Sequence, residues 1–362
     1  MIREYLSRSL FALGVCAAGA LLNVSAAQAY TAEYVFGDSL SDNGNLAAAG
    51  GITFPNPPSY NNSFTNGPVA VQLLAESLGL TLSASDWLNA PAVPAGTNYA
   101  VGGATSAEGA VGGIPGINLP DQVGAYSAYA SGVADPNALY VIMIGGNDVR
   151  DAALSKLGEP AEDNAIDAGV AAEKAAIQTL SSEGAKNFLI VNVPDVGLIP
   201  EFTQENPTLA STATQLSEDY NTLLAQDLGQ LDETLPAGTN LHEFDLLAYN
   251  ASLLAEAGAL GFTNTTDPCF TNAPLTAGTT AGCGVDGANI AGYVYWNDVH
   301  PTARVQALWA AGFESAIPEP STWALLLIGF AGLAFAAHRK SAARSVTRAS
   351  GSLRVRIVQG RL

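Results

Sequence analysis

The sequence predicts an α/β protein of three layers, α/β/α, with a mainly parallel sheet. Short runs rich in β-branched and aromatic residues alternate with longer segments of helical periodicity, which is typical of parallel strands joined by helices. No internal repeat and no long linker interrupts this alternation between residues 30 and 317. We therefore expect one domain over residues 30–317 in a chain of 362 residues.

The strands and the two clearest helices can be assigned in order. A helix is expected over residues 165–180, closed by Gly184 before the next strand begins. His242 is interpreted as a strand-end residue. The expected strands cover residues 33–36, 139–144, 188–193 and 241–244, and a second helix carries apolar side chains at Leu209, Ala213, Leu216, Tyr220, Leu223 and Leu231.

The first 29 residues have the order of a secretory signal peptide. Arg3 and Arg8 precede an apolar run over residues 10–22, and Ala27-Gln28-Ala29 supplies small residues for a cleavage site. We expect cleavage after Ala29, so that the mature chain begins near Tyr30 outside the cytoplasm.

The carboxyl-terminal end carries a second targeting signal. Pro318-Glu319-Pro320 precedes an apolar stretch over residues 324–337, followed by a basic cluster that ends at Lys340. Residues 318–340 resemble the PEP-CTERM sorting signal of Gram-negative bacteria. The resemblance implies a transient anchor in the membrane through a short helix, cleavage by an exosortase-type enzyme, and delivery to the periplasm, cell surface or extracellular matrix. Residues 341–362 form a basic tail.

The charge of the body argues against nucleic-acid binding. Residues 30–317 contain five Lys and Arg against 31 Asp and Glu, a balance of −26, whereas the whole chain carries −19. A body this acidic repels polyphosphate.

Two cysteines remain in the mature chain. Cys269 and Cys283 flank a segment rich in Gly, Thr and Ala, and in an oxidising compartment we expect a disulfide between them. A pair of free thiols is the alternative. No metal site is expected, because neither His242 nor His300 lies at ligand spacing from these cysteines.

A candidate nucleophile follows the first strand. Residues 34–36 run directly into Gly37-Asp38-Ser39-Leu40-Ser41, which places Ser39 at the carboxyl end of a strand, where open α/β sheets bind ligands. The segment is not a G-x-S-x-G elbow, because its last position is serine. Taken alone, Ser39 is equally compatible with a helix cap.

Further segments, in the same order along the chain, resemble the GDSL family of SGNH hydrolases. The resemblance covers residues 33–313 and implies a flavodoxin-like fold and ester hydrolysis without a cofactor. The segments are 98–106 (Asn-Tyr-Ala-Val-Gly-Gly-Ala-Thr-Ser), 144–148 (Ile-Gly-Gly-Asn-Asp), 295–302 (Tyr-Trp-Asn-Asp-Val-His-Pro-Thr), and, more loosely, 64–68, 193–197 and 261–264.

These residue types suit acyl transfer, which needs a nucleophile, a base and donors for the oxyanion. Ser39 supplies the hydroxyl, and neutral His300 can accept its proton. Pro301 is expected to start a helix directly after His300. The expected oxyanion donors are the backbone N–H groups of Ser39 and Gly103 and the side-chain amide of Asn147.

The third member of a triad departs from the family pattern. Asn297 stands three residues before the histidine, where the family usually has aspartate, and Asp298 follows. Three partners for the His300 ring remain open: a main-chain carbonyl near Trp296, the side-chain oxygen of Asn297, and Asp298 in a shifted turn. The first two are preferred.

The sequence thus predicts an exported serine ester hydrolase, an esterase or lipase acting on acyl or aryl esters. Two alternatives stay open: an acyltransferase or polysaccharide deacetylase of the extracellular matrix, and a non-catalytic surface protein on the same fold. Loops at residues 45–62 and 267–290 are expected to line the substrate pocket.

Overall fold

The computed structural model describes residues 30–90, 94–271, 283–284 and 288–317. The described residues belong to one compact unit. The signal peptide, the sorting signal and the basic tail expected from the sequence therefore lie outside the described residues.

Four parallel strands form the central sheet in the order β1-β2-β3-β4, and each pairs with its neighbour over five residues. An isolated bridge between Val35 and Asn98 adds a short parallel contact on the outer edge of β1. The predicted parallel sheet is confirmed. Its strands are β1 (Glu33–Gly37), β2 (Leu139–Met143), β3 (Asn187–Val191) and β4 (Asn240–Phe244).

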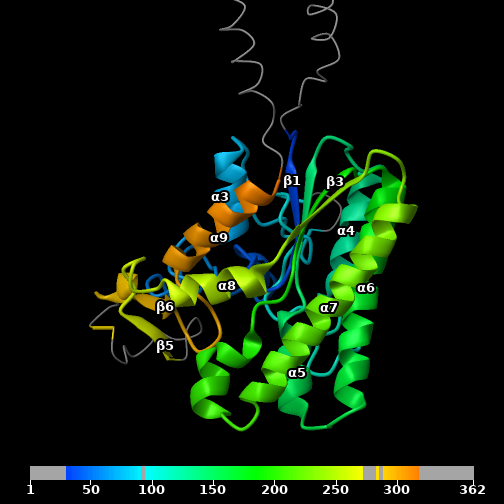
Figure 1. The fold of residues 1–362 in the computed structure, drawn as a ribbon. Coiled ribbons are helices and arrows are strands. Elements are labelled where there is room, and N and C mark those ends of the chain that lie inside the picture. Colours follow the sequence, from blue (N-terminus) through cyan, green and yellow to red (C-terminus); the bar gives the residue numbers. More distant parts are fainter. Residues whose placement is uncertain (1–29, 91–93, 272–282, 285–287, 318–362) are drawn as a thin grey trace, which may run out of the picture. The chain divides into compact units, whose positions relative to one another are not determined.

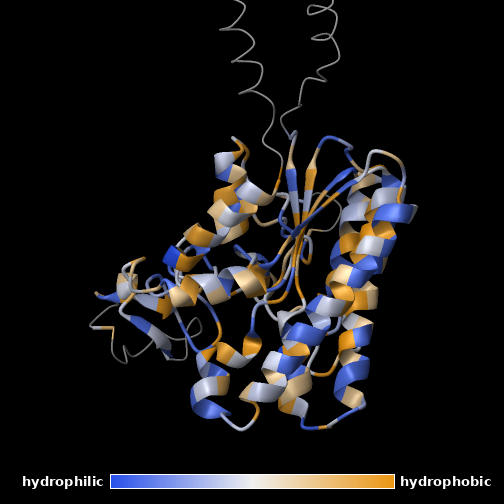
Figure 2. Ribbon diagram, in the orientation of Figure 1, coloured by the Kyte–Doolittle hydropathy of each residue, from blue (hydrophilic) through white to orange (hydrophobic). Residues whose placement is uncertain are grey.

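Helices cover both faces of the sheet, which gives the predicted α/β/α layers (Figure 1). Strands covered on both faces are almost continuously apolar, as β2 and β3 are, and Figure 2 shows this concentration of hydrophobic residues in the sheet. One layer holds α4 (Leu119–Ala130), α5 (Gly146–Ser155), α6 (Ala161–Glu183) and α7 (Ala210–Thr234); the other holds α3 (Ala70–Ser77), α8 (Leu246–Ala255) and α9 (Ala303–Ala316).

Helix boundaries follow the local signals. Helix α6 ends where Gly184 adopts φ 121°, a conformation that favours glycine, so the predicted stop is confirmed. His242 lies in the middle of β4 and not at its end, because the strand begins at Asn240.

Shorter elements lie around the carboxyl ends of the strands. They are α2 (Asn45–Ala49), η2 (Val196–Leu198), the π-helical turn η3 (Glu201–Glu205), η5 (Ile290–Gly292), and a parallel pair formed by β5 (Asn264–Pro268) and β6 (Tyr293–Tyr295). Within the described part of the chain, no helix has the length and apolar character needed to span a bilayer.

Candidate active site

Ser39 lies two residues beyond the end of β1, in a turn that the neighbouring backbone shapes. A Cβ on Gly37 would lie 2.4 Å from the carbonyl oxygen of Met143 in β2, so only glycine fits there. Asp38 then accepts a hydrogen bond from the backbone N–H of Leu40 (2.9 Å). The turn leaves Ser39 9% exposed.

His300 reaches Ser39 across 261 positions of sequence. Its Nε2 lies 2.6 Å from Ser39 Oγ, and its Nδ1 lies 3.0 Å from Asn297 Oδ1. The same Oδ1 accepts the backbone N–H groups of Val299 and His300, which fixes which end of the amide faces the ring. Because Oδ1 can only accept, Nδ1 carries the hydrogen and Nε2 presents its lone pair to the serine.

The other two candidate partners of the ring are occupied elsewhere or do not reach it. The main-chain carbonyl of Trp296 accepts the N–H of Phe270 (2.9 Å). Within the described residues, no hydrogen bond joins the Asp298 side chain to His300. Of the three alternatives, the geometry places the Asn297 oxygen at the ring.

Burial, and to a smaller extent the nearby charge of Arg150, lowers the pKa of His300 to about 3. The imidazole is therefore neutral at pH 7, the form that can accept a proton. Phe64 packs on the ring with centroids 5.1 Å apart.

Two of the three expected oxyanion donors border the pocket at Ser39. Asn147 stands in the first turn of α5 and lines this pocket with Ser39. Its Nδ2 donates to the carbonyl of Ala104 (2.8 Å), which holds the amide next to the loop that carries Gly103. Gly103 adopts φ 85° and does not itself line the pocket. Within the described residues, the backbone N–H groups of Ser39 and Gly103 have no acceptor in the protein.

The loop of His300 is held from two sides. Thr65 Oγ1 donates to the carbonyl of Pro301 (3.0 Å), and Asn66 Oδ1 accepts the N–H of Ala303 at the start of α9. The expectation that Pro301 directly starts a helix was wrong, because Thr302 is the cap residue and Pro301 bridges to Tyr295.

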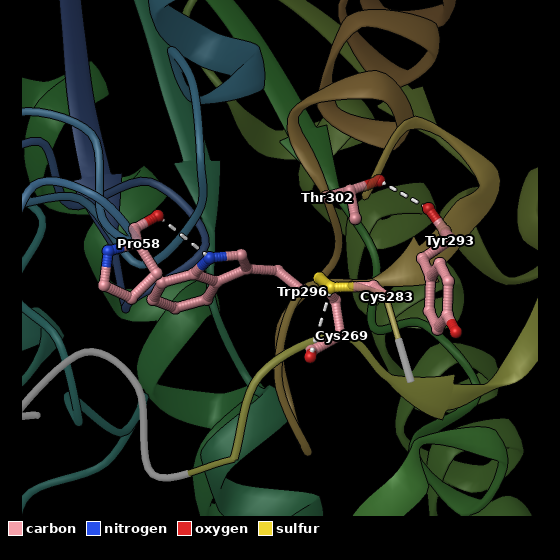
Figure 3. Close-up of a disulfide and its surroundings, with 6 residues drawn as sticks. All are labelled: Pro58, Cys269, Cys283, Tyr293, Trp296 and Thr302. Carbon is pink, nitrogen blue, oxygen red and sulfur yellow. Dashed lines mark hydrogen bonds between the residues drawn. A yellow bond between two sulfur atoms is a disulfide. The ribbon is translucent and has the colours of Figure 1, made fainter. Parts of the chain in front are cut away.

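On the other side, a disulfide joins Cys269 and Cys283 beside Trp296 (Figure 3). The Trp296 indole N–H donates to the carbonyl of Pro58 (3.1 Å), and the N–H of Cys269 donates to that of Tyr295 (3.1 Å). The disulfide therefore supports the strand that leads into the His300 loop.

An ion pair that sequence reasoning missed links α5 to the same loop. Arg150 contacts Glu201 through two nitrogens (2.5 and 2.6 Å), and it also pairs with Asp151. The N–H of Glu201 donates to the carbonyl of Asp298 (2.9 Å). The only available signal was that Arg150 is one of five basic residues in the body.

A group of buried carboxyls lies near this site. Burial raises the pKa of Asp38 to about 7, of Asp148 to about 6 and of Glu173 to about 8. Tyr220 donates to Glu173, and its hydroxyl lies 2.8 Å from that of Ser106. Glu173 belongs to a long helix without a motif, so no sequence signal marked it.

Among the residues that the structure describes, no three His, Cys, Asp or Glu side chains are arranged to hold a metal ion.

Comparison with known proteins yields two matches that divide the chain. Residues 34–313 match the family described as GDSL-like Lipase/Acylhydrolase, and residues 316–340 match the PEP-CTERM protein-sorting motif, which indicates export.

Among curated proteins, the chain is 37% identical to Lipase 1 of Photorhabdus luminescens over 54% of this chain and 27% of that protein. It is 28% identical to the thermolabile hemolysin of Vibrio parahaemolyticus over 74% and 59%, respectively. The chain thus covers less than two thirds of the length of either. Among solved structures, the extracellular lipase of Streptomyces rimosus aligns over 79% of this chain and all of that one, with 15% identity and a TM-score of 0.37.

Proposed function

We propose that this chain, which belongs to the GDSL-like lipase/acylhydrolase family, is an exported serine ester hydrolase that acts through an acyl-enzyme on Ser39. Membership of the family makes it a hydrolase; the ester bond and the mechanism are our proposal. The observation that carries it is the 2.6 Å contact between Ser39 Oγ and His300 Nε2, with Asn297 Oδ1 on the other ring nitrogen.

The proposed reaction has two halves. Ser39 Oγ attacks the ester carbonyl carbon while its proton passes to His300 Nε2, and the oxyanion is held by the N–H groups of Ser39 and Gly103 and by the Asn147 amide. Collapse breaks the bond to the alcohol, which leaves with the proton from His300. Water then attacks the acyl carbonyl carbon while one of its protons passes to His300 Nε2. The bond from this carbon to Ser39 Oγ breaks, and Oγ takes the proton back from His300 as the acid is released. No metal or cofactor takes part.

Asn297 acts in this scheme as a positioning residue. Its oxygen holds the tautomer in which Nε2 can accept a proton, but a neutral amide cannot balance the charge that forms on the ring. We therefore expect a slower enzyme than one with a carboxylate there, with His300 neutral down to acidic pH.

Export would proceed through the two terminal signals. We propose that cleavage after Ala29 releases the amino end, that an exosortase-type enzyme processes the segment 318–340, and that the domain 30–317 reaches the surface or matrix of a Gram-negative cell. The sorting motif also favours one alternative to hydrolysis, in which a polysaccharide hydroxyl replaces water as the acceptor of the acyl group. In the extracellular matrix, the same acyl-enzyme would then transfer its acyl group to polysaccharide.

Turnover of p-nitrophenyl esters tests the proposal directly. Ser39→Ala and His300→Ala should abolish it, and Asn147→Ala should lower kcat by about 10²–10³-fold, the usual effect of losing one oxyanion donor. Wild type should also react at Ser39 with a fluorophosphonate probe. Equal rates for wild type and Ser39→Ala, with no labelling, would instead identify a non-catalytic protein. Supplying a sugar alcohol and measuring ester transfer separates hydrolase from acyltransferase.

A further inference from the structure

An apolar groove continues from the pocket at Ser39 and runs between α8 and α9. It encloses about 680 Å³, including the space at its open mouth. Four residues line both the groove and the smaller pocket that contains Ser39, namely Leu40, Pro194, Ile199 and Val299. Leu40 follows the nucleophile and Val299 precedes the base, so two of the residues shared by the groove and the pocket are sequence neighbours of the reacting residues.

Helix α8 supplies the outer wall of this groove. Leu247, Ala251 and Leu254 recur at helical spacing and line it together with the buried Leu253, while Leu246 is buried and does not line the groove. The helix thus presents apolar side chains both to the core and to the groove, and Leu253 contributes to both. The side that lines the groove, with Ala251 exposed at its rim, is available to a ligand.

Several polar groups of the wall have partners within the protein. The Trp309 indole N–H donates to Asn250 Oδ1 (2.7 Å), and the Tyr295 hydroxyl donates to the carbonyl of Leu198 (3.0 Å). Asp195 Oδ1 accepts from Gly197 and from Thr214. A ligand in the groove would therefore find apolar surface and few hydrogen-bonding groups, which suits a hydrocarbon chain.

We propose that this groove holds the acyl chain of the ester substrate and that Ala251 controls the chain length accepted. The inference rests on the proposed function. The acyl chain is the purely hydrocarbon part of most esters, and it stays bonded to Ser39 through both half-reactions, next to Leu40. The smaller pocket that contains Ser39 and Asn147 is then left for the alcohol part. The pocket loops expected at residues 45–62 and 267–290 do not contribute to the groove where the structure describes them.

The test compares Ala251→Trp with Ala248→Trp in the full chain. Ala248 is also exposed on α8 but does not line the groove, so it is a matched control. The substrates are p-nitrophenyl acetate, butyrate, hexanoate and octanoate. Each methylene that becomes buried favours binding by about fourfold. If the indole displaces two methylenes, Ala251→Trp should lower kcat/KM for octanoate by about tenfold or more and change that for acetate by less than twofold. The control should match wild type.

Three results would overturn the inference: an equal loss at all acyl lengths, no loss at any length, or a loss only in a parallel series of alkyl acetates, which would assign the groove to the alcohol. A binding measurement separates this inference from the proposed function. Octanoate should bind Ser39→Ala, and adding Ala251→Trp should weaken that binding by about tenfold. This binding result is expected even if the wild type hydrolyses no ester. Octanoate binding that Ala251→Trp leaves unchanged would refute the assignment of the groove without refuting the proposed function.

Discussion

Replacing Asn297 by Asp should raise both the pKa of His300 and the rate of ester hydrolysis at neutral pH. Asn297 Oδ1 lies 3.0 Å from His300 Nδ1, and the pKa of His300 is lowered to about 3 by burial and by Arg150. The amide fixes the tautomer but leaves the imidazolium without a counter-charge. A carboxylate in the same position supplies one.

The size of the effect follows from two opposing contributions. A full charge 3.0 Å from the ring is worth about 5 kcal/mol at an effective dielectric constant of about 20. Burying a carboxylate at a residue that is 6% exposed costs several kcal/mol. The two backbone N–H groups that already bond Oδ1 offset part of this cost. A net gain of about 1.5–3 kcal/mol raises the pKa of His300 by about one to two units and kcat/KM by about 10- to 100-fold.

The assay is kcat/KM for p-nitrophenyl butyrate between about pH 4 and pH 8. Because the base must be neutral, wild type should lose no activity to protonation of His300 in this range. In Asn297→Asp, the acid limb of the pH profile should be shifted to higher pH. Asn297→Ala should lose about 10²-fold or more, since the tautomer is no longer held, and Asp298→Ala should stay close to wild type. If Asn297→Asp changes neither rate nor limb, or if Asp298→Ala alone abolishes turnover, Asn297 does not orient the histidine.

Three other outcomes are expected. Glu201→Gln should lower kcat about tenfold, because the pair with Arg150 positions the His300 loop; an unchanged kcat in steady-state kinetics would contradict this. Glu173→Gln should gain stability relative to wild type as pH rises from about 4 to 8 in denaturant titrations. Because burial raises the pKa of Glu173 in the folded protein, this residue contributes stability to wild type that is fully present below the unfolded pKa of 4.5. That contribution is lost as the pH rises through the folded pKa of about 8. Reducing the Cys269–Cys283 disulfide should cost about 3 kcal/mol, which thermal unfolding with and without reductant measures; an unchanged melting temperature would count against it.

The sheet could be predicted because its strands carry their signal locally. Residues 139–143 and 187–191 are apolar runs covered on both faces, and such runs are visible without knowledge of the fold. Strand β5, by contrast, is the polar run Asn264–Pro268 and exists only through its pairing with β6. Periodicity cannot find a strand of that kind.

The residues of the candidate site could be predicted where they belong to ordered sequence motifs. Contacts that depend on how the loops fold could not be predicted. Motifs identify Ser39, His300 and Asn147, but the partner of the His300 ring depends on how one turn closes. Glu201 joins the site through a backbone hydrogen bond from a π-helical turn that no local pattern marks. The groove wall was hidden for another reason: a helix that is apolar on more than one side, such as α8, resembles an ordinary core helix.

The separation of 261 positions from Ser39 to His300 bears on biosynthesis. Synthesis runs from the amino end, so the hydroxyl emerges early, whereas the imidazole, with α9 behind it, belongs to the last part of the domain to leave the ribosome. No nascent chain stopped before that point holds both groups, however much of the sheet it has already formed. Chemical competence is therefore acquired once, at completion, and truncated products should be inert toward esters.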